Sequence, residues 1–374
     1  LATQISSLRN AIFFDVKMEG FKNALKKNTR IKGSKVHLTI NRLASERRLH
    51  RKKVRRHSRA KLNLSVFEQL NEQLGDVPSE ALRCEGQSFR VTLAGEHADD
   101  SGGPFRTIFQ TVSNELKSGT FDMFIAVPGK NEIYVPNPRC NDVSRFTFFG
   151  RLMGICLSSN VHLDINMAEI CWKFLVGEKN WSWRDIANVD KDFKIMYEDV
   201  KHRLSRKEEE DEEEDSNDLY MKVKGIDGTE YALFPGGEKV RVRGTDMLRT
   251  WLRLAEEYRV NELKVQCEAI RRGLVSQLPQ CSKFLSIFSS LELEEMVCGE
   301  SVLNIDLLEK HTTYMDGYDR NHAVIRRFWK VLRQFTNRQR QMYLKFVYGT
   351  ARLPENLGRS ETHKICKMKD SGND

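Results

Sequence analysis

The sequence predicts a mixed α+β fold, and two kinds of apolar pattern support that prediction. Apolar residues recur at helical spacing in residues 62–74 (LNLSVFEQLNEQL) and in residues 104–116, which begin with a proline. Alternation of apolar and polar residues in 88–95 (SFRVTLAG) predicts a strand. The segments 123–127 (MFIAV) and 132–136 (EIYVP) flank the turn residues PGKN, so we expect a pair of strands there.

Residues 146–157 (FTFFGRLMGICL) are almost entirely apolar and therefore predict a buried helix. Gly150 and Gly154 lie four residues apart on this helix. That spacing favours the close approach of a second helix, because glycine has no side chain to hold a neighbour away.

The second half of the chain mixes helices with short strands. Strand-like pieces cover 219–225, 230–237 and 238–244, and Thr245 or Asp246 can then cap a further helix. Near the end, we expect Asp319 and Thr336 each to cap a helix, and HKICKM (363–368) to form a strand. The residues expected to face the core are Val324, Ile325, Phe328, Trp329 and Leu332 on the first of these helices and Tyr343, Phe346 and Val347 on the second.

The composition is that of a soluble globular protein, with 40% hydrophobic and 30% charged residues. A chain of 374 residues is long enough for two or three packed units. No apolar run approaches the roughly 18 residues that a membrane span needs, so we expect none. The first residues lack a signal-peptide layout and do not begin with Met, which we interpret as a piece cut from a longer protein.

The eight cysteines are scattered, and no pair has C-x-x-C spacing. Neither structural zinc nor another metal site is therefore expected. Cys156 and Cys171 lie inside apolar runs, which indicates buried, reduced thiols. Reduced cysteines predict a cytoplasmic location, with the nucleus as a further one.

The formal net charge of +9 is unevenly distributed. Residues 42–61 (RLASERRLHRKKVRRHSRAK) contain ten Lys or Arg and one acid, whereas residues 208–215 (EEEDEEED) are all acidic. The basic run fits a nuclear-import signal, a patch for nucleic acid or an acidic partner, or a solvated helix face. The acidic run is either an inert insertion or a segment that steers basic partners.

Seven motifs recur in a family-like order and spacing over nearly the whole chain. They are DDSGGPFR (99–106), FTFFGRLMGICL (146–157) with NVHLD (160–164), AIRRGL (269–274), LELEEMVCG (291–299), HTTYMDGY (311–318), VIRRFWKVL (324–332) and FVYGTARLP (346–354). Each motif is weak alone, but the set resembles the HECT domain of ubiquitin ligases, and most of all the domains at the C-termini of very large ligases.

The resemblance implies a bilobal α+β architecture. A mostly helical N-lobe would cover residues 1–298 and contain a small β-bearing subdomain at about 170–255 that docks a conjugating enzyme. A smaller α+β C-lobe, incomplete in this chain, would cover residues 305–374.

A hinge at residues 299–304 would join the two lobes. The expected hinge residues are Gly299, Glu300 and Ser301, because a hinge is a few residues that absorb a backbone change. Gly299 could equally be a glycine that ends a helix.

The family accepts ubiquitin on a cysteine as a thioester and passes it to substrate lysines. It places that cysteine in an L-P-x-x-x-T-C-F stretch after the strand that matches HKICKM. The nucleophile is therefore expected beyond Asp374, and this fragment alone is expected to be inactive. Cys366 lies nearest, but it lacks the Pro and Thr context, and we interpret it as a strand residue.

The family docks the conjugating enzyme in a shallow apolar groove. Matching motif positions here are Phe193 and Tyr197, one helical turn apart, together with Met221 and Trp251. The alternative is that all four are core residues. An aromatic side chain at a groove centre often dominates the binding energy of such an interface.

The leading hypothesis is a ubiquitin transferase whose partners are a conjugating enzyme, ubiquitin and protein substrates, with no metal, nucleotide or organic cofactor. The main alternative is a HECT-like scaffold that binds such partners without transfer. Nucleic-acid binding rests only on residues 42–61, which lack the interleaved aromatics that stack bases, and we do not expect it.

Overall fold

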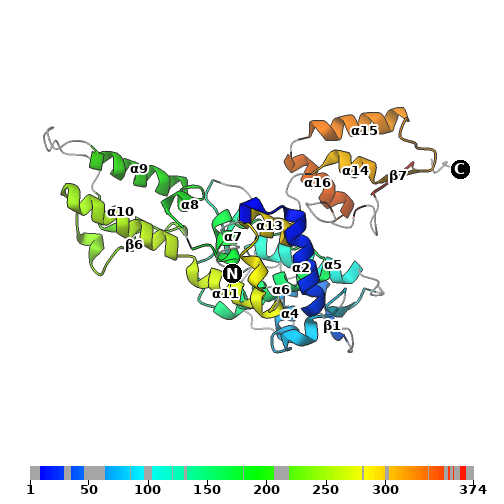
Figure 1. Cartoon of the computed structure of the whole chain (residues 1–374), viewed down its shortest axis with the longest axis horizontal. Helices are drawn as coiled ribbons and strands as arrows, with labels where there is room; N and C mark the ends of the chain where they lie inside the picture. The colour runs from blue at the N-terminus through cyan, green and yellow to red at the C-terminus, as the bar shows by residue number, and fades with distance from the viewer. Residues whose placement is uncertain are drawn as a thin grey trace.

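The structure is a computed structural model, drawn in Figure 1. It describes residues 9–28, 35–45, 64–84, 86–96, 103–119, 121–129, 133–179, 181–205, 219–279, 282–299, 303–335, 337–348, 353, 357 and 363–367. Within these residues the fold is mostly helical with four two-stranded sheets, which confirms the α+β prediction. The acidic run and most of the basic run lie outside the described residues.

The described residues form two separate hydrophobic cores. The first extends from Phe21 to Cys298, and the second from Leu303 to Leu353. We call the parts of the chain around them the larger body and the smaller body. Figure 1 shows the smaller body, in orange and red, at one end of the molecule.

The larger body begins with helices packed beside two small sheets. Its first elements are η1 (Arg9–Ala11), α2 (Phe14–Asn28), β1 (Val36–Ile40), α4 (Val66–Leu74), η2 (Ser79–Leu82), β2 (Phe89–Leu93), α5 (Gly103–Lys117), β3 (Phe124–Ala126), β4 (Tyr134–Pro136) and α6 (Val143–Ser159). The predicted pair β3–β4 is confirmed and antiparallel. Strand β2 pairs in parallel with β1, a partner that no local pattern had indicated.

The elements of the second half of the larger body are α7 (Glu169–Val176), α8 (Trp183–Ala187), α9 (Lys191–Ser205), β5 (Lys222–Lys224), β6 (Glu230–Ala232), η3 (Gly237–Lys239), α10 (Gly244–Asn261), α11 (Lys264–Gln277), α12 (Ser282–Leu285) and α13 (Ser290–Cys298). We call the part from α8 to α10 the arm; its paired helices α9 and α10 are coloured green in Figure 1. The first two strand-like pieces become β5 and β6. The third does not: residues 237–239 form a 3₁₀ turn, and only an isolated bridge joins Arg241 to Tyr220.

Helices α6 and α11 cross at the centre of the larger body with almost no side-chain material between them. A Cβ atom on Gly150 would overlap the carbonyl oxygen of Ile270, and one on Gly273 would overlap that of Thr147. A Cβ on Gly154 would lie 2.6 Å from the Cβ of Gln277. The predicted close approach at the two glycines of α6 is therefore confirmed.

Helix α4 is held by a buried charge at each end. At its start, the carboxylate of Glu115 on α5 accepts hydrogen bonds from the backbone N–H groups of Val66 (2.8 Å) and Phe67 (2.9 Å). At its end, the Arg151 guanidinium on α6 donates to the carbonyl oxygens of Leu74 (2.9 Å) and Gly75 (3.1 Å). Each charge complements the helix dipole and pairs backbone groups that a helix end leaves free.

The smaller body packs two long helices over a parallel strand pair. Its elements are α14 (Ile305–Lys310), β7 (Thr312–Met315), α15 (Ala323–Gln334), α16 (Asn337–Tyr348) and β8 (His363–Cys366). Strands β7 and β8 pair in parallel, with Thr312 opposite His363, so the predicted strand at 363–368 is confirmed.

Three expectations about helices were wrong in detail. Val324 on α15 is 49% exposed, and Phe346 and Val347 on α16 are 88% and 36% exposed, although all three were expected in the core. Helix α15 starts later than expected, and its N-cap is His322 rather than Asp319. Helix α10 starts at Gly244, before the two residues expected to cap it. In each case the apolar pattern located the helix but not its rotation or its first residue.

Candidate functional site

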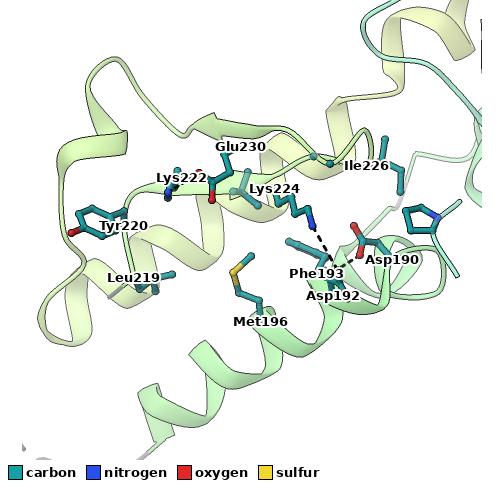
Figure 2. Close-up of a pocket in the computed structure, with 14 residues that line it drawn as sticks. Asp190, Asp192, Phe193, Met196, Leu219, Tyr220, Lys222, Lys224, Ile226 and Glu230 are labelled. Atoms are coloured by element: carbon teal, nitrogen blue, oxygen red, sulfur yellow. Dashed lines mark hydrogen bonds and ion pairs between the residues drawn. The ribbon is translucent and has the colours of Figure 1, made fainter. Parts of the chain in front are cut away.

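The arm of the larger body carries a cavity of about 530 Å³ beside β5 and the start of α9 (Figure 2). Its lining residues are Pro128, Asp190, Asp192, Phe193, Met196, Leu219, Tyr220, Lys222, Val223, Lys224, Gly225, Ile226, Gly228 and Glu230. All but Pro128 belong to the segment 190–230, so the arm builds the cavity almost alone. The volume is in the range of small-ligand and side-chain pockets.

A buried arginine fixes the floor of this cavity. Arg259 on α10 donates from Nε to Glu262 (2.8 Å) and from its terminal nitrogens to Asp190 (2.9 Å) and to the carbonyl oxygen of Lys224 (2.9 Å). Its guanidinium also lies 4.7 Å from the ring centroid of Phe193. One cation thus joins the start of α9, strand β5 and the end of α10.

Glu262 is buried against that arginine. It also accepts a hydrogen bond from the backbone N–H of Ile226 at 3.1 Å, which anchors the turn after β5. Burial raises the pKa of Glu262 above its usual value, while Arg259 opposes the rise. The carboxylate is therefore a structural partner of the cation and not a solvent-exposed base.

Two of the predicted docking residues lie on the inner face of α9. Phe193 and Tyr197 have ring centroids 5.5 Å apart, which confirms that their spacing places them on one face. Phe193 lines the cavity, whereas Tyr197 stacks on Trp183 at 4.8 Å and donates its hydroxyl to Glu256 at 2.8 Å. Burial, followed by the bond to Glu256, raises the pKa of Tyr197.

The other two predicted docking residues lie in the interior of the arm. Met221 is 2% exposed and Trp251 is 0% exposed. The indole N–H of Trp251 donates to the carbonyl oxygen of Lys222 at 3.1 Å, so the ring supports β5 from behind. Burial of Phe193, Tyr197, Met221 and Trp251 favours the interpretation that they are core residues, and a direct docking role for them stays a prediction.

The accessible apolar surface of the cavity comes from residues that the sequence did not single out as site residues. Met196, Leu219 and Tyr220 are partly exposed and line it together with the buried Ile226. Figure 2 shows Met196 pointing from α9 into the cavity, to the right of Leu219 and Tyr220. Met196 follows Phe193 by three residues, so helical spacing could have found it; the other three need the strand register.

The rim of the cavity carries both signs of charge. Lys224 lies 3.8 Å from Asp192, and Lys222 lies 2.7 Å from Glu230. These pairs are largely exposed, so each contributes little stability. An apolar floor with a mixed charged rim is suited to holding an apolar side chain of a partner protein, and its lining residues include no cysteine.

Gly299 follows α13 at the predicted hinge. Its backbone is in a positive-φ conformation (φ 83°), and its N–H donates to Glu295 at 2.7 Å. A Cβ here would lie 2.9 Å from Nδ1 of His162. Gly299 thus ends a helix, which was the open alternative, and the other two expected hinge residues, Glu300 and Ser301, lie outside the described residues.

Most of the described cysteines are buried. Cys156, Cys171, Cys267 and Cys298 are buried, while Cys366 is exposed on β8. A hydrogen bond with Cys171, and then burial, raises the pKa of Cys267, and burial raises that of Cys156. Such thiols are poor nucleophiles. Cys366 is the last residue of β8, which confirms its assignment to a strand.

A buried histidine joins the strands and helices of the smaller body. Nδ1 of His363 lies 2.8 Å from the Thr312 hydroxyl, and Nε2 lies 2.6 Å from the Tyr343 hydroxyl. Because Thr312 donates its own proton to the Leu308 carbonyl, the His363 proton belongs on Nδ1. Burial lowers the pKa of His363 to about 4, so the ring is neutral at pH 7.

Within the described ranges, no group of three or more His, Cys, Asp or Glu residues is arranged to hold a metal ion. The same residues contain no helix that is both long and apolar enough to cross a membrane.

Comparisons with known proteins agree on one family. The model of the HECT domain (ubiquitin-transferase) matches residues 110–372. The chain is 30% identical over 305 residues to the E3 ubiquitin-protein ligase HERC2 of Mus musculus and of Homo sapiens, an alignment that covers 78% of this chain and 6% of HERC2.

Two other relatives are more distant in sequence. The E3 ubiquitin-protein ligase UPL2 of Arabidopsis thaliana is 29% identical, over 71% of this chain and 7% of the relative. The E3 ubiquitin-protein ligase NEDD4 of Mus musculus is 28% identical, over 71% of this chain and 30% of the relative. The chain spans a small part of the length of these relatives, and it belongs to the HECT-domain (ubiquitin-transferase) family.

Proposed function

We propose that this chain is the transferase part of a ubiquitin ligase, which takes ubiquitin from a conjugating enzyme and delivers it to lysines of substrate proteins. The observation that carries the proposal is the family match, which runs from α5 through the larger body and into the smaller body. The N-lobe at 1–298, the hinge at 299–304 and the C-lobe at 305–374 belong to the same proposal.

The proposed chemistry is exchange between thioesters. A cysteine thiolate attacks the carbonyl carbon of the ubiquitin thioester, a new S–C bond forms, and the conjugating enzyme leaves as a thiolate. A substrate lysine amine then attacks the second thioester, loses a proton and forms an isopeptide bond, which releases the ligase thiolate. We propose that the acceptor cysteine follows strand β8, where the family resemblance places it. The raised pKa of the Cys156 and Cys267 thiols leaves both of them poor nucleophiles.

The conjugating enzyme is proposed to dock at the cavity on the arm. Support comes from the partly exposed apolar side chains of Met196, Leu219 and Tyr220 around a floor that Arg259 fixes. Phe193 supplies the aromatic part of that floor. Tyr197, Met221 and Trp251 shape the cavity from behind and act on docking through it.

The test compares two neighbouring residues of α9. Met196→Asp places a charge in the cavity, whereas Ile195→Asp places the same charge at a side chain that is 67% exposed and does not line the cavity. With a panel of ubiquitin-loaded conjugating enzymes, we expect Met196→Asp to weaken binding at least about tenfold, as for a hot-spot residue. Ile195→Asp should change binding less than about twofold.

Two results would count against the proposal. Equal effects of the two variants would refute docking at the cavity. A polypeptide extended past Asp374 that binds the loaded enzyme, but never gains a ubiquitin adduct sensitive to reducing agents, would refute transfer and leave the scaffold hypothesis.

A further inference from the structure

The outer face of α15 in the smaller body is basic and exposed. Residues 303–374 contain 14 Lys or Arg and 8 Asp or Glu, a net of +6 out of the +9 of the whole chain. Helix α15 alone has four of these cations and no acid. In Figure 1 it lies along the edge of the smaller body that faces away from the larger body.

Three of the four cations on α15 have no carboxylate partner among the described residues. Arg333 is the exception, since it bonds to Asp306 at 2.7 Å and also to Glu309, both on α14. Arg326, Arg327 and Lys330 are exposed, and no ion pair within the described part of the chain involves them. No described carboxylate neutralises their positive potential at close range, so this face attracts an incoming negative group.

Two valines form an apolar edge beside these cations. Val324 is 49% exposed and Val331 is 48% exposed, and they lie seven residues apart. Seven residues are close to two helical turns, so the two side chains project in nearly the same direction about 10 Å apart. The core face of α15 is formed instead by Ile325, Trp329 and Leu332.

Helical geometry gives the order of side chains across the exposed face. At 100° per residue, Arg326 and Lys330 share one side of this face, Arg327 lies between, and Val331 and Val324 form the opposite side. A single surface thus combines three free cations with two apolar contacts one heptad apart. Among the described residues, neither the three cations nor the two valines take part in the core or in an ion pair of the smaller body.

We propose that this face binds an acidic amphipathic helix of a partner protein. Negative side chains along one side of such a helix complement Arg326, Arg327 and Lys330, and apolar residues one heptad apart cover Val324 and Val331. A nucleic acid fits less well, because the aromatic rings of α15 pack against the core, Phe328 partly and Trp329 fully buried, and the valines would gain nothing. The surface is separate from the cavity on the arm, so it serves recruitment and not docking of the conjugating enzyme.

The probe is a short synthetic helix with glutamates along one side and two leucines one heptad apart, and its binding to the full chain is measured by fluorescence anisotropy. Arg326→Glu combined with Lys330→Glu should weaken binding at least about tenfold, because two attractive pairs become repulsive. Lys26→Glu combined with Lys27→Glu, an equal charge change on exposed residues of α2, should leave it within about twofold. Binding should also fall several-fold between about 50 and 200 mM salt.

The apolar part of the proposal has its own variant. Val324→Ser combined with Val331→Ser should weaken the probe about fivefold without changing the salt dependence, since no charge is altered. A control peptide has the same composition, but its two leucines are moved out of the heptad spacing. Its affinity for the wild-type chain should be no higher than the affinity of the probe for the double valine variant. All substituted residues are exposed, so the unfolding temperature should be unchanged.

Several outcomes overturn the proposal. No binding of the probe at millimolar concentration overturns it, as does binding that the α15 variants do not weaken. A single-stranded oligonucleotide, or a vesicle of phosphatidylserine and phosphatidylcholine, that binds more tightly than the probe and responds to the same charge variants would assign the face to a polyanion instead. The test measures binding alone, so it stands or fails independently of ubiquitin transfer.

Discussion

Arg259→Met tests whether one buried cation holds the docking cavity together. The side chain of Arg259 is 1% exposed, and it bonds to Glu262, to Asp190 and to the carbonyl oxygen of Lys224. Methionine can fill much of the volume, but it leaves two carboxylates without their cation. Breaking a buried ion pair from one side costs about 3–5 kcal/mol, so we expect the free energy of unfolding of the arm to fall by about 4 kcal/mol.

The matched control is Arg253→Met on the same helix. Arg253 is 68% exposed and has one ion pair, 3.5 Å from Glu257. An exposed pair of this kind contributes less than about 1 kcal/mol, so the control should unfold almost as the wild type does. Comparing the two variants separates the effect of breaking a buried ion pair from the effect of removing an arginine.

Urea denaturation and amide hydrogen exchange in α9 and β5 measure the effect. The loss in Arg259→Met should be smaller at pH 5 than at pH 7.5, because a protonated Glu262 needs no cation and burial already raises its pKa. Loss of less than about 1 kcal/mol in Arg259→Met, or an equal loss in Arg253→Met, would refute the reasoning.

Three further variants probe the other buried contacts. Glu115→Gln should lower the free energy of unfolding by about 2–4 kcal/mol, because the amide nitrogen replaces one of the two accepting oxygens and then faces a backbone N–H at the start of α4; urea denaturation against Glu72→Gln, an exposed residue of α4, checks it. Gly273→Ala should prevent native packing of α6 on α11, because its Cβ meets the Thr147 carbonyl, whereas Gly119→Ala, with open space around it, should retain the folded circular dichroism spectrum and cost only the strain of its positive φ. Between about pH 6.5 and its folded pKa of about 4, His363 binds fewer protons in the folded than in the unfolded protein. The free energy of unfolding of the smaller body should therefore fall by about 2 kcal/mol as the pH falls through that range. Hydrogen exchange in α15 should show this loss in the wild type and a flatter pH dependence in His363→Gln.

Local patterns in the sequence predicted what depends on neighbours along the chain. The stripe in residues 62–74 located α4, and Ser65 explains why the helix starts at Val66: its hydroxyl accepts from the Glu68 N–H while the Glu68 side chain returns the bond. The glycines of α6 indicated the crossing with another helix, but not that α11 supplies the partner carbonyl.

Contacts between distant segments were beyond sequence reasoning. Arg151, Glu115 and Arg259 are charged residues in ordinary-looking helices, and only the fold shows that each satisfies backbone or carboxylate groups far along the chain. For the same reason, the docking prediction did not distinguish residues that line the cavity from residues that lie behind it. Trp251 and Met196 are both apolar residues on amphipathic helices, and burial alone distinguishes the one behind the strand from the one in the cavity.

The Glu115 carboxylate has a consequence for how this chain tolerates changes in length. It bonds to the Ser45 hydroxyl and to the Val66 N–H, so it clamps the two flanks of residues 46–63 at one point. Contacts made by the surrounding helices thus offset the chain entropy that is lost when these two flanks are brought together. Changes of sequence or length between these flanks should therefore leave both bonds to Glu115 in place.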